Sequence, residues 1–467
     1  MEEKSWKDKV MYNPQNGFKR IAKEDKELIE EYCVDYKKFL DAGKTERECV
    51  IESIKQAETV GFKEFKRGMK LQAGDKIYVN NRGKMLMLAV IGRQSLRNGI
   101  QIAASHIDSP RLDLKPSPLY EDSEMSYLKT HYYGGIRKYQ WVTIPLELHG
   151  VVSLTNGENV NVRIGEGYEP KLVITDLLPH LASEQSNKPL HKGIEGEQLN
   201  LLIGSEPLEG EETDAVKLHV MKLLFEKYGF VEEDFISAEL EAVPAFNAVD
   251  IGLDRSMIGA YGHDDRVCAY ASLKALLDMT EVPERTAVCV LADKEEIGSQ
   301  GVSGMKTNAF ESFIEALCQT QEVGLLECLD NSFCLSADVT AAFDPNFPEV
   351  FEKRNNAKIN YGIGLCKYTG SGGKGGASDA CAETVAYVRR AFDDACIVWQ
   401  MSEMGKVDVG GGGTVALDMA RRNIDTLDAG VPVLSMHAPF EVVSKLDCYM
   451  TYKAMGVVFA QKTGVKY

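Results

Sequence analysis

The second half of the chain alternates short apolar runs with longer amphipathic segments. From about Asn247 onward, a buried strand is repeatedly followed by a helix. The expected strands are residues 286–292, 333–337 and 431–436, and the expected helices are residues 266–279 and 378–392. Runs that are apolar throughout, rather than at every second position, are typical of strands covered on both faces. This alternation predicts an α/β fold with a mostly parallel sheet.

The N-terminal part of the chain also shows the sequence patterns of helices and buried strands. Apolar residues, including Leu28, recur at helical spacing in residues 24–39. A second helix, with Ile51 on its apolar stripe, is expected to begin at Thr45, because Glu48 completes a capping box. Two short apolar runs, residues 85–91 and 100–104, read as further strands. We therefore expect both ends of the chain to build one α/β domain.

A stretch of different character separates these two parts. Between Ser109 and Val243 the sequence contains mostly short strands and turns. The pair Asn156-Gly157, followed by alternating apolar residues, predicts a hairpin, and a helix is expected at residues 213–228. We predict an α/β domain made of residues 1–108 and 247–467, with a β-rich insertion at residues 109–246.

The charge balance excludes some classes of partner. The chain has 467 residues, with 53 Lys and Arg against 70 Asp and Glu, which gives a formal net charge of -17. Such a charge repels nucleic-acid phosphates and anionic lipid surfaces, and the sequence has no local basic patch to offset it. Residues 1–9 lack the apolar stretch of a secretory signal and no later run approaches a membrane span, so we expect a cytoplasmic protein. The eleven cysteines include no Cys-x-x-Cys pair, which argues against a thiolate zinc site and a disulfide framework.

Residue types that bind metal ions follow several of the predicted strands. His106 and Asp108 follow residues 100–104, Glu295 and Glu296 follow 286–292, Asp338 follows 333–337, and His437 follows 431–436. Asp264 and Asp265 stand directly before the predicted helix at 266–279. In an open α/β sheet, binding sites form at the carboxyl ends of the strands, because the loops there converge on one crevice. We therefore expect these side chains to form one cluster.

The donor types in this set favour a pair of metal ions. Imidazole nitrogens together with carboxylate oxygens suit Zn²⁺, with Mn²⁺ or Co²⁺ as substitutes. Two histidines and at least three carboxylates exceed the ligands of one catalytic zinc, so we expect two ions that share an activated water and are bridged by one carboxylate, for which Asp264 is a candidate. Glu295 and Glu296 are adjacent and their side chains diverge, so one is expected as a ligand and the other as a base. Asp108 is expected to accept the second ring N–H of His106 and to fix its tautomer.

Sequence motifs occur in order along nearly the whole chain: ASHIDSPR at 104–111, DKEEIGS at 293–299, SAD at 336–338 and SMHAPFE at 435–441. Together they resemble the M18 family of metallo-aminopeptidases, the aspartyl aminopeptidase and aminopeptidase I group, and are most similar to its bacterial branch. The resemblance implies a phosphorylase/hydrolase-like metallopeptidase fold and the release of single residues from peptide N-termini by two zinc ions. It implies that one zinc is bound by His106, Asp264 and Asp338. The other would be bound by Asp264, Glu296 and His437, with Glu295 as the general base.

The same resemblance implies an assembly. In this family the β-rich insertion is a dimerisation domain, and dimers form a tetrahedral dodecamer that encloses the active sites. Residues 178–182 (LPHLA) resemble the segment that carries a histidine into a neighbouring subunit's active site, which makes His180 a candidate for substrate contact. The glycine-rich loop at 369–376 resembles the loop that lines the substrate pocket, which makes Lys374 a second candidate. This loop is not a phosphate-binding P-loop, since Tyr368 and Gly375 occupy positions where that motif needs Gly and Ser or Thr.

The sequence leaves the substrate preference and the reaction open to alternatives. The aspartyl-specific branch has a histidine where this chain has Ala341, and usually an asparagine where it has Asp265. A preference for acidic N-terminal residues is therefore not implied. Another two-metal amide hydrolase, such as an acylamino-acid deacylase or a carboxypeptidase, would use the same residues, and a non-catalytic assembly protein stabilised by metal is the non-enzymatic alternative. The main expectation is an aminopeptidase that acts on peptides with a free N-terminus.

Overall fold

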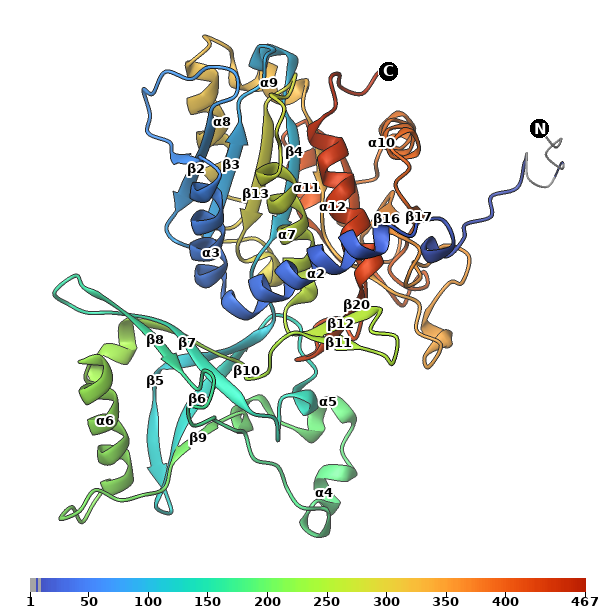
Figure 1. The fold of residues 1–467 in the computed structure, drawn as a ribbon. Coiled ribbons are helices and arrows are strands. Elements are labelled where there is room, and N and C mark those ends of the chain that lie inside the picture. The colour runs from blue at the N-terminus through green and yellow to red at the C-terminus, as the bar shows by residue number, and fades with distance from the viewer. Residues whose placement is uncertain (1–5, 7–9) are drawn as a thin grey trace.

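The computed structural model describes residue 6 and residues 10–467. Residues 1–5 and 7–9, which belong to the stretch expected to lack a secretory signal, lie outside the described residues. Figure 1 shows a large sheet among helices in the upper part of the view and a smaller sheet below it. Within the described part of the chain, no helix combines the length and the apolar character needed to cross a bilayer.

A nine-stranded sheet forms the centre of the α/β part of the described chain. In spatial order its strands are β1 (Lys63–Glu64), β2 (Lys76–Asn81), β3 (Met85–Val90), β13 (Ala287–Ala292), β4 (Gln101–His106), β14 (Phe333–Ser336), β18 (Asp425–Gly430), β16 (Ile363–Cys366) and β17 (Trp399–Met401). The neighbouring strands β13, β4, β14 and β18 pair in parallel. Within β13, Val288 and Val290 face one core, whereas Cys289 and Leu291 face another. Both faces are covered, which is why this strand reads as an uninterrupted apolar run.

Helices cover both faces of the large sheet. One face carries α2 (Asp25–Ala42), α3 (Glu46–Thr59), α7 (His263–Leu277), α10 (Ala382–Asp394) and α12 (Lys445–Phe459), and the other carries α8 (Ala309–Gln319), α9 (Leu325–Asp330) and α11 (Val415–Ala420). Helices of the first set share a core with Leu291 of β13, and helices of the second set share a core with Val290. This arrangement confirms the mixed α/β class expected from the alternation of strands and helices.

A second sheet is built from residues 111–244. In spatial order its strands are β8 (Asn159–Ile164), β7 (Leu146–Ser153), β10 (Ala238–Pro244), β5 (Arg111–Asp122), β6 (Met125–Tyr133) and β9 (Leu201–Gly204). All of these neighbours pair antiparallel, and Asn156-Gly157 lies in the turn of the predicted hairpin between β7 and β8. Helix α6 (Ala215–Tyr228) packs on this sheet and contributes Val220 to its core. These residues fall inside the expected insertion, whose role as a separate domain stays a prediction.

A third sheet joins short strands from distant parts of the chain. Its order is β11 (Val249–Ile251), β12 (Met257–Ala260), β20 (Glu441–Ser444), β19 (Pro432–Leu434) and β15 (Thr340–Ala341). The strand predicted at 431–436 is present as β19, but it lies in this third sheet, and the large sheet instead contains β18, which the sequence does not predict. β18 does not read as an apolar run since it contains the buried Asp428, whose carboxylate accepts a hydrogen bond from Thr414 Oγ1 at 2.7 Å.

Both predicted N-terminal helices are present, and the second begins with the predicted cap. The capping box at the start of α3 is present, because Thr45 Oγ1 accepts the Glu48 N–H at 3.2 Å and Glu48 Oε2 accepts the Thr45 N–H at 3.1 Å. The predicted apolar stripes are wrong at Leu28 and Ile51, whose side chains are 46% and 59% exposed. In each helix the preceding or following residue is buried instead, Ile29 in the first helix and Val50 in the second.

Replacing Thr45 by alanine should loosen the first turn of α3. Thr45 is buried, and the change leaves the Glu48 N–H without its side-chain acceptor. Loss of such a cap costs about 1 kcal/mol, which corresponds to roughly fivefold faster local opening. Hydrogen–deuterium exchange over residues 46–50 measures this opening. The control Thr59→Ala, at the exposed end of the same helix, should leave the first turn unchanged, and equal exchange in both variants would contradict the assigned cap.

Candidate metal centre

Adjacent parallel strands bring metal-binding side chains to one edge of the large sheet. His106 is the last residue of β4, Asp338 stands two residues after β14, and Glu295 opens a short 3₁₀ turn (Glu295–Ile297) after β13. Because β4 lies between β13 and β14, the carboxyl ends of these strands meet at His106. His106 Nε2 lies 3.7 Å from Asp338 Oδ1 and 4.0 Å from Glu295 Oε2. The structure thus brings these residues together.

Asp264 lies between two histidines. It stands at the start of α7, where Asp264 and Asp265 have non-helical backbone angles. Asp264 Oδ1 is 3.2 Å from His106 Nε2, and Asp264 Oδ2 is 3.2 Å from His437 Nε2. His437 Nε2 is also 3.5 Å from Glu296 Oε2. The two oxygens of one carboxylate therefore face two different imidazoles, and each imidazole has a second carboxylate beside it.

His437 reaches the cluster from the third sheet and not from the large one. It lies in the turn between β19 and β20, so the expectation that it follows a strand of the same sheet as His106 is wrong. The chain leaves β18 at Gly430, where a Cβ atom would lie 1.7 Å from the Asp338 carbonyl oxygen. At Gly430 the chain leaves the large sheet and passes close to Asp338. His437, which follows a few residues later, therefore still lies in the cluster.

Backbone carbonyl groups orient both histidine rings. His106 Nδ1 lies 3.0 Å from the Asp108 carbonyl oxygen, and His437 Nδ1 lies 2.8 Å from the Gly135 carbonyl oxygen. A carbonyl oxygen only accepts hydrogen bonds, so each Nδ1 carries a proton and donates it. When the ring is neutral, its Nε2 atom is therefore unprotonated and faces the carboxylates, as a metal ligand requires.

Both carboxylate oxygens of Asp108 bond to groups around the cluster. Asp108 Oδ1 lies 3.3 Å from His106 Nδ1 and accepts the Glu295 N–H at 3.2 Å. Asp108 Oδ2 accepts the Glu296 N–H at 3.2 Å and the Tyr133 hydroxyl at 2.8 Å. Both oxygens are occupied by ring, hydroxyl or backbone groups of the surrounding segments. This environment fits the expected contact with the outer nitrogen of His106.

Glu441 and Tyr133 are site residues to which the sequence analysis gives no role. Glu441 Oε1 accepts the His437 N–H at 2.7 Å, and Glu441 Oε2 accepts the Asp264 N–H at 3.0 Å. Glu441 lies within the motif at 435–441, which could have drawn attention to it, although the motif does not reveal its partners. Tyr133 contacts Asp108 from another sheet, and no spacing in the sequence marks it.

Burial and mutual repulsion raise the pKa values of the three glutamates Glu295, Glu296 and Glu441. Burial raises the pKa of Glu295 to about 8, with the Asp338 carboxylate adding to the shift. Burial together with the Asp264 carboxylate raises the pKa of Glu441 to about 8 and that of Glu296 well above its ordinary value. Glu296 Oε1 is buried and has no hydrogen-bond partner among the described residues. A cation bound here would relieve the repulsion and give this oxygen a partner.

The histidine rings respond to the same negative charges. Burial disfavours the charged ring of His106, but the nearby carboxylates, led by Asp108, outweigh burial and raise its pKa well above the ordinary value. For His437 burial is again outweighed, here by Asp264 and Glu296, and the pKa rises to about 10. Protons on these rings therefore offset part of the negative charge, and a divalent cation would replace them on binding.

The two predicted substrate residues lie apart from the cluster. His180 is exposed in a short 3₁₀ turn (Pro179–Leu181), and it forms no hydrogen bond or ion pair with any described residue. Lys374 Nζ lies 2.9 Å from Asp379 Oδ2 and 3.8 Å from the centre of the Tyr368 ring. Within the described chain, neither side chain contacts the predicted metal ligands.

In another group of metal-binding residue types, both carboxylates are paired with an arginine. Glu48, His149 and Glu166 lie close enough to share an ion. Arg163 Nη2 is 2.8 Å from Glu48 Oε1, and Arg163 Nη1 is 2.9 Å from Glu166 Oε1. Because the guanidinium supplies the positive charge between these carboxylates, the group is an ion-pair cluster between α3 and the six-stranded sheet.

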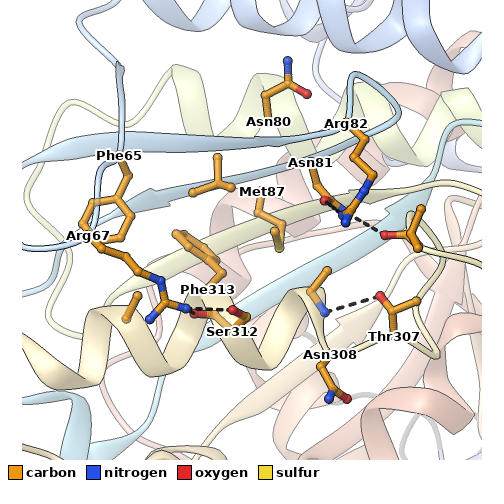
Figure 2. Close-up of a pocket in the computed structure, with 14 residues that line it drawn as sticks. Phe65, Arg67, Asn80, Asn81, Arg82, Met87, Thr307, Asn308, Ser312 and Phe313 are labelled. Carbon is orange, nitrogen blue, oxygen red and sulfur yellow. Dashed lines mark hydrogen bonds between the residues drawn. The ribbon is translucent and has the colours of Figure 1, made fainter.

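A cavity of about 520 Å³ lies elsewhere, between β2, β3 and α8 (Figure 2). Phe65, Met87 and Phe313 form part of its wall, and Arg67 beside it donates a hydrogen bond to Ser312 Oγ at 2.8 Å. The residues that line this cavity include none of the predicted ligands or substrate residues. The predicted chemistry therefore belongs to the strand ends and not to this cavity.

A family model and curated relatives match nearly the whole chain. The model of the aminopeptidase I zinc metalloproteases (M18) matches residues 39–459. A probable M18 family aminopeptidase 1 of Clostridium acetobutylicum is 50% identical over 440 residues, which cover 92% of this chain and 94% of that protein. A probable M18 family aminopeptidase 1 of Thermotoga maritima is 43% identical over 435 residues, which cover 92% of this chain and 95% of that protein.

Solved structures agree with these matches. The crystal structure of an M18 family aminopeptidase from Thermotoga maritima gives a TM-score of 0.92 at 41% identity, covering 96% of this chain and 99% of that chain. Aminopeptidase I from Clostridium acetobutylicum gives a TM-score of 0.91 at 45% identity, covering 97% and 100%. The mApe1 dodecamer of Saccharomyces cerevisiae shares the fold, with a TM-score of 0.75 at 21% identity, covering 94% and 98%. Because the family model and the bacterial relatives each span nearly the whole chain, it belongs to the M18 family of aminopeptidase I zinc metalloproteases, as its motifs predict.

Proposed function

We propose that this chain is an aminopeptidase that uses two zinc ions per subunit to release single residues from the free N-termini of peptides. The observation that carries the proposal is the placement of Asp264, whose carboxylate oxygens each lie 3.2 Å from a different imidazole, that of His106 or His437. A carboxylate in this position can bridge two cations. Membership of a zinc aminopeptidase family supports the class of reaction.

The proposed ligands form two sets that share Asp264. His106 and Asp338 complete one set, and Glu296 and His437 complete the other. Each set offers imidazole nitrogen and carboxylate oxygen, the donors that zinc takes in catalytic sites, and Mn²⁺ or Co²⁺ are proposed substitutes. When bound, the zinc ions would supply Lewis acidity that activates water and polarises the substrate carbonyl.

Glu295 is the proposed general base. Its carboxylate is at the cluster, with Oε2 4.0 Å from His106 Nε2, while its backbone N–H is held by Asp108. From this position the carboxylate can take a proton from the attacking water and deliver it to the leaving amine. Burial raises the pKa of Glu295 to about 8 in the absence of a cation. Nearby cations would lower that pKa, so Glu295 would begin the reaction as a carboxylate.

The proposal extends to the assembly. Residues 109–246 would form a dimerisation domain, and dimers would build a tetrahedral dodecamer around the active sites. Support comes from exposed apolar side chains near His180, namely Leu177, Leu178 and Leu181, which a neighbouring subunit would cover. His180 would then contact substrate bound in a neighbour, and Lys374 would contact substrate in its own subunit. The proposed location is the cytoplasm, which rests on the sequence alone.

Glu295→Gln should abolish most of the turnover without removing zinc. The amide cannot accept the proton, so we expect kcat to fall by about 10² to 10⁴. Because Glu295 is not a proposed ligand, zinc content measured by atomic absorption should stay near that of the wild type. The control Glu315→Gln changes an exposed glutamate on α8 and should leave both values unchanged. Normal turnover in Glu295→Gln would rule out its role as the base.

A blocked N-terminus separates the aminopeptidase from its enzymatic alternatives. Aminoacyl p-nitroanilides with a free amine should be cleaved, and their N-acetyl counterparts should not. A deacylase would instead act on the acetylated compound, and a carboxypeptidase would release the C-terminal residue of a peptide. Chromatography of the products identifies which bond is cut. Cleavage of the blocked substrate at a similar rate would contradict the proposed function.

Zinc should stabilise the protein more at pH 8 than at pH 6. The folded pKa of Glu295, about 8, lies above its ordinary value of 4.5, so the folded chain binds this proton more tightly than the unfolded chain. Without a cation, the fold loses the resulting stability as the pH rises between these two values. Zinc meets less competition from protons at the higher pH. Thermal unfolding of the chelator-treated protein, with and without added zinc, measures the effect, and a Tm shift that is larger at pH 6 would contradict the argument.

A further inference from the structure

We propose that Tyr133–Gly135, the end of β6 and the two residues after it, is a positioning segment of the metal centre. The proposal rests on the proposed two-zinc function. β6 belongs to the six-stranded sheet in the lower part of Figure 1, whereas His106 ends a strand of the large sheet. Tyr133 and Gly135 form hydrogen bonds with Asp108 and His437, and Gly134 lies beside Glu296.

Tyr133 holds Asp108. Its hydroxyl donates a hydrogen bond to Asp108 Oδ2 at 2.8 Å, and its side chain is buried. The Arg111 guanidinium lies 3.9 Å from the centre of the Tyr133 ring, and its Nε–H donates a hydrogen bond to Asp113 Oδ1 at 2.8 Å. The hydroxyl is therefore held in place through its ring. Asp108 in turn accepts the backbone N–H groups of the turn that begins at Glu295. Tyr133 therefore helps to fix the position of this turn through Asp108.

Gly135 orients His437. Its carbonyl oxygen lies 2.8 Å from His437 Nδ1, which must carry the proton of this hydrogen bond. His437 Nε2 is then left to face Asp264 and Glu296, at 3.2 Å and 3.5 Å. Partners of this kind fix the tautomer and direction of a ligating ring, and their loss weakens metal binding by about 10- to 100-fold.

Gly134 leaves room for Glu296. A Cβ atom at Gly134 would lie 3.3 Å from Glu296 Cβ and 3.4 Å from Glu296 Oε2. The backbone φ of Gly134 is +75°, a conformation that favours glycine. A side chain at this position would press on a proposed zinc ligand in addition to straining its own backbone. Three consecutive residues thus act on Asp108, Glu296 and His437, and through them on both proposed zinc ions.

Two pairs of variants test the segment. Gly134→Ala is matched by Gly157→Ala, since Gly157 has a φ of +90° but no atom within 4 Å of the added Cβ. Tyr133→Phe removes a single oxygen and is matched by Tyr132→Phe, which changes the exposed neighbour on the same strand. If Gly134→Ala fails to fold, Tyr133→Phe still tests the proposal.

Zinc dissociation constants, from competition with a chromogenic chelator, are the main readout. We expect Gly134→Ala and Tyr133→Phe to weaken at least one zinc about 10- to 100-fold, while both controls match the wild type. The visible spectrum of the cobalt-substituted protein should also change in Tyr133→Phe, and kcat should fall more than KM changes. Wild-type affinity and spectrum in both test variants would overturn the positioning role alone. A wild-type protein that binds no zinc would overturn the two-zinc function, and with it this inference.

Discussion

The position of Asp264 determines the geometry of both proposed metal sites, since a bridging carboxylate belongs to both. Its backbone N–H donates to Glu441 Oε2 at 3.0 Å, and its carbonyl oxygen accepts the Ser109 hydroxyl at 2.6 Å. These bonds direct its carboxylate between His106 of the large sheet and His437 beside the third sheet. A displacement of either sheet would therefore change the geometry of both proposed sites. The cluster forms only when both sheets are in place.

Buried ion pairs connect the six-stranded sheet to the α/β part of the chain. Lys44 Nζ lies 2.6 Å from Glu147 Oε2, and Arg111 Nη1 lies 3.4 Å from Glu46 Oε2. Such pairs add little net stability, because desolvation offsets their attraction, but removing one partner is costly. We infer that they favour one placement of the sheet. Arg111 also packs on the Tyr133 ring. The placement of the six-stranded sheet therefore also determines where the hydrogen bond from Tyr133 to Asp108 forms.

Sequence reasoning works best where a site residue follows a parallel strand. His106 and Asp338 are predicted to meet because apolar runs mark their strands and parallel pairing aligns the strand ends. The same reasoning fails at β18, since hydrogen-bonded polar residues interrupt its apolar pattern. Glu441 and Tyr133 escape prediction because each contacts a residue far away in the sequence, and no local spacing records such a contact.

Asp108 and Glu441 anchor the cluster by the same physical means. Asp108 accepts the backbone N–H groups of Glu295 and Glu296, and Glu441 accepts those of His437 and Asp264. Both carboxylates thus hold main-chain atoms of residues whose side chains face the cluster, which leaves those side chains free to bind. A ligand with a fixed backbone loses less conformational freedom when a cation arrives. The buried Asp108 carboxylate, whose pKa is lowered against the effect of burial by its hydrogen bond with His106, also strengthens the negative field at the centre. The repulsion that raises carboxyl pKa values without a cation therefore favours the cation-bound state.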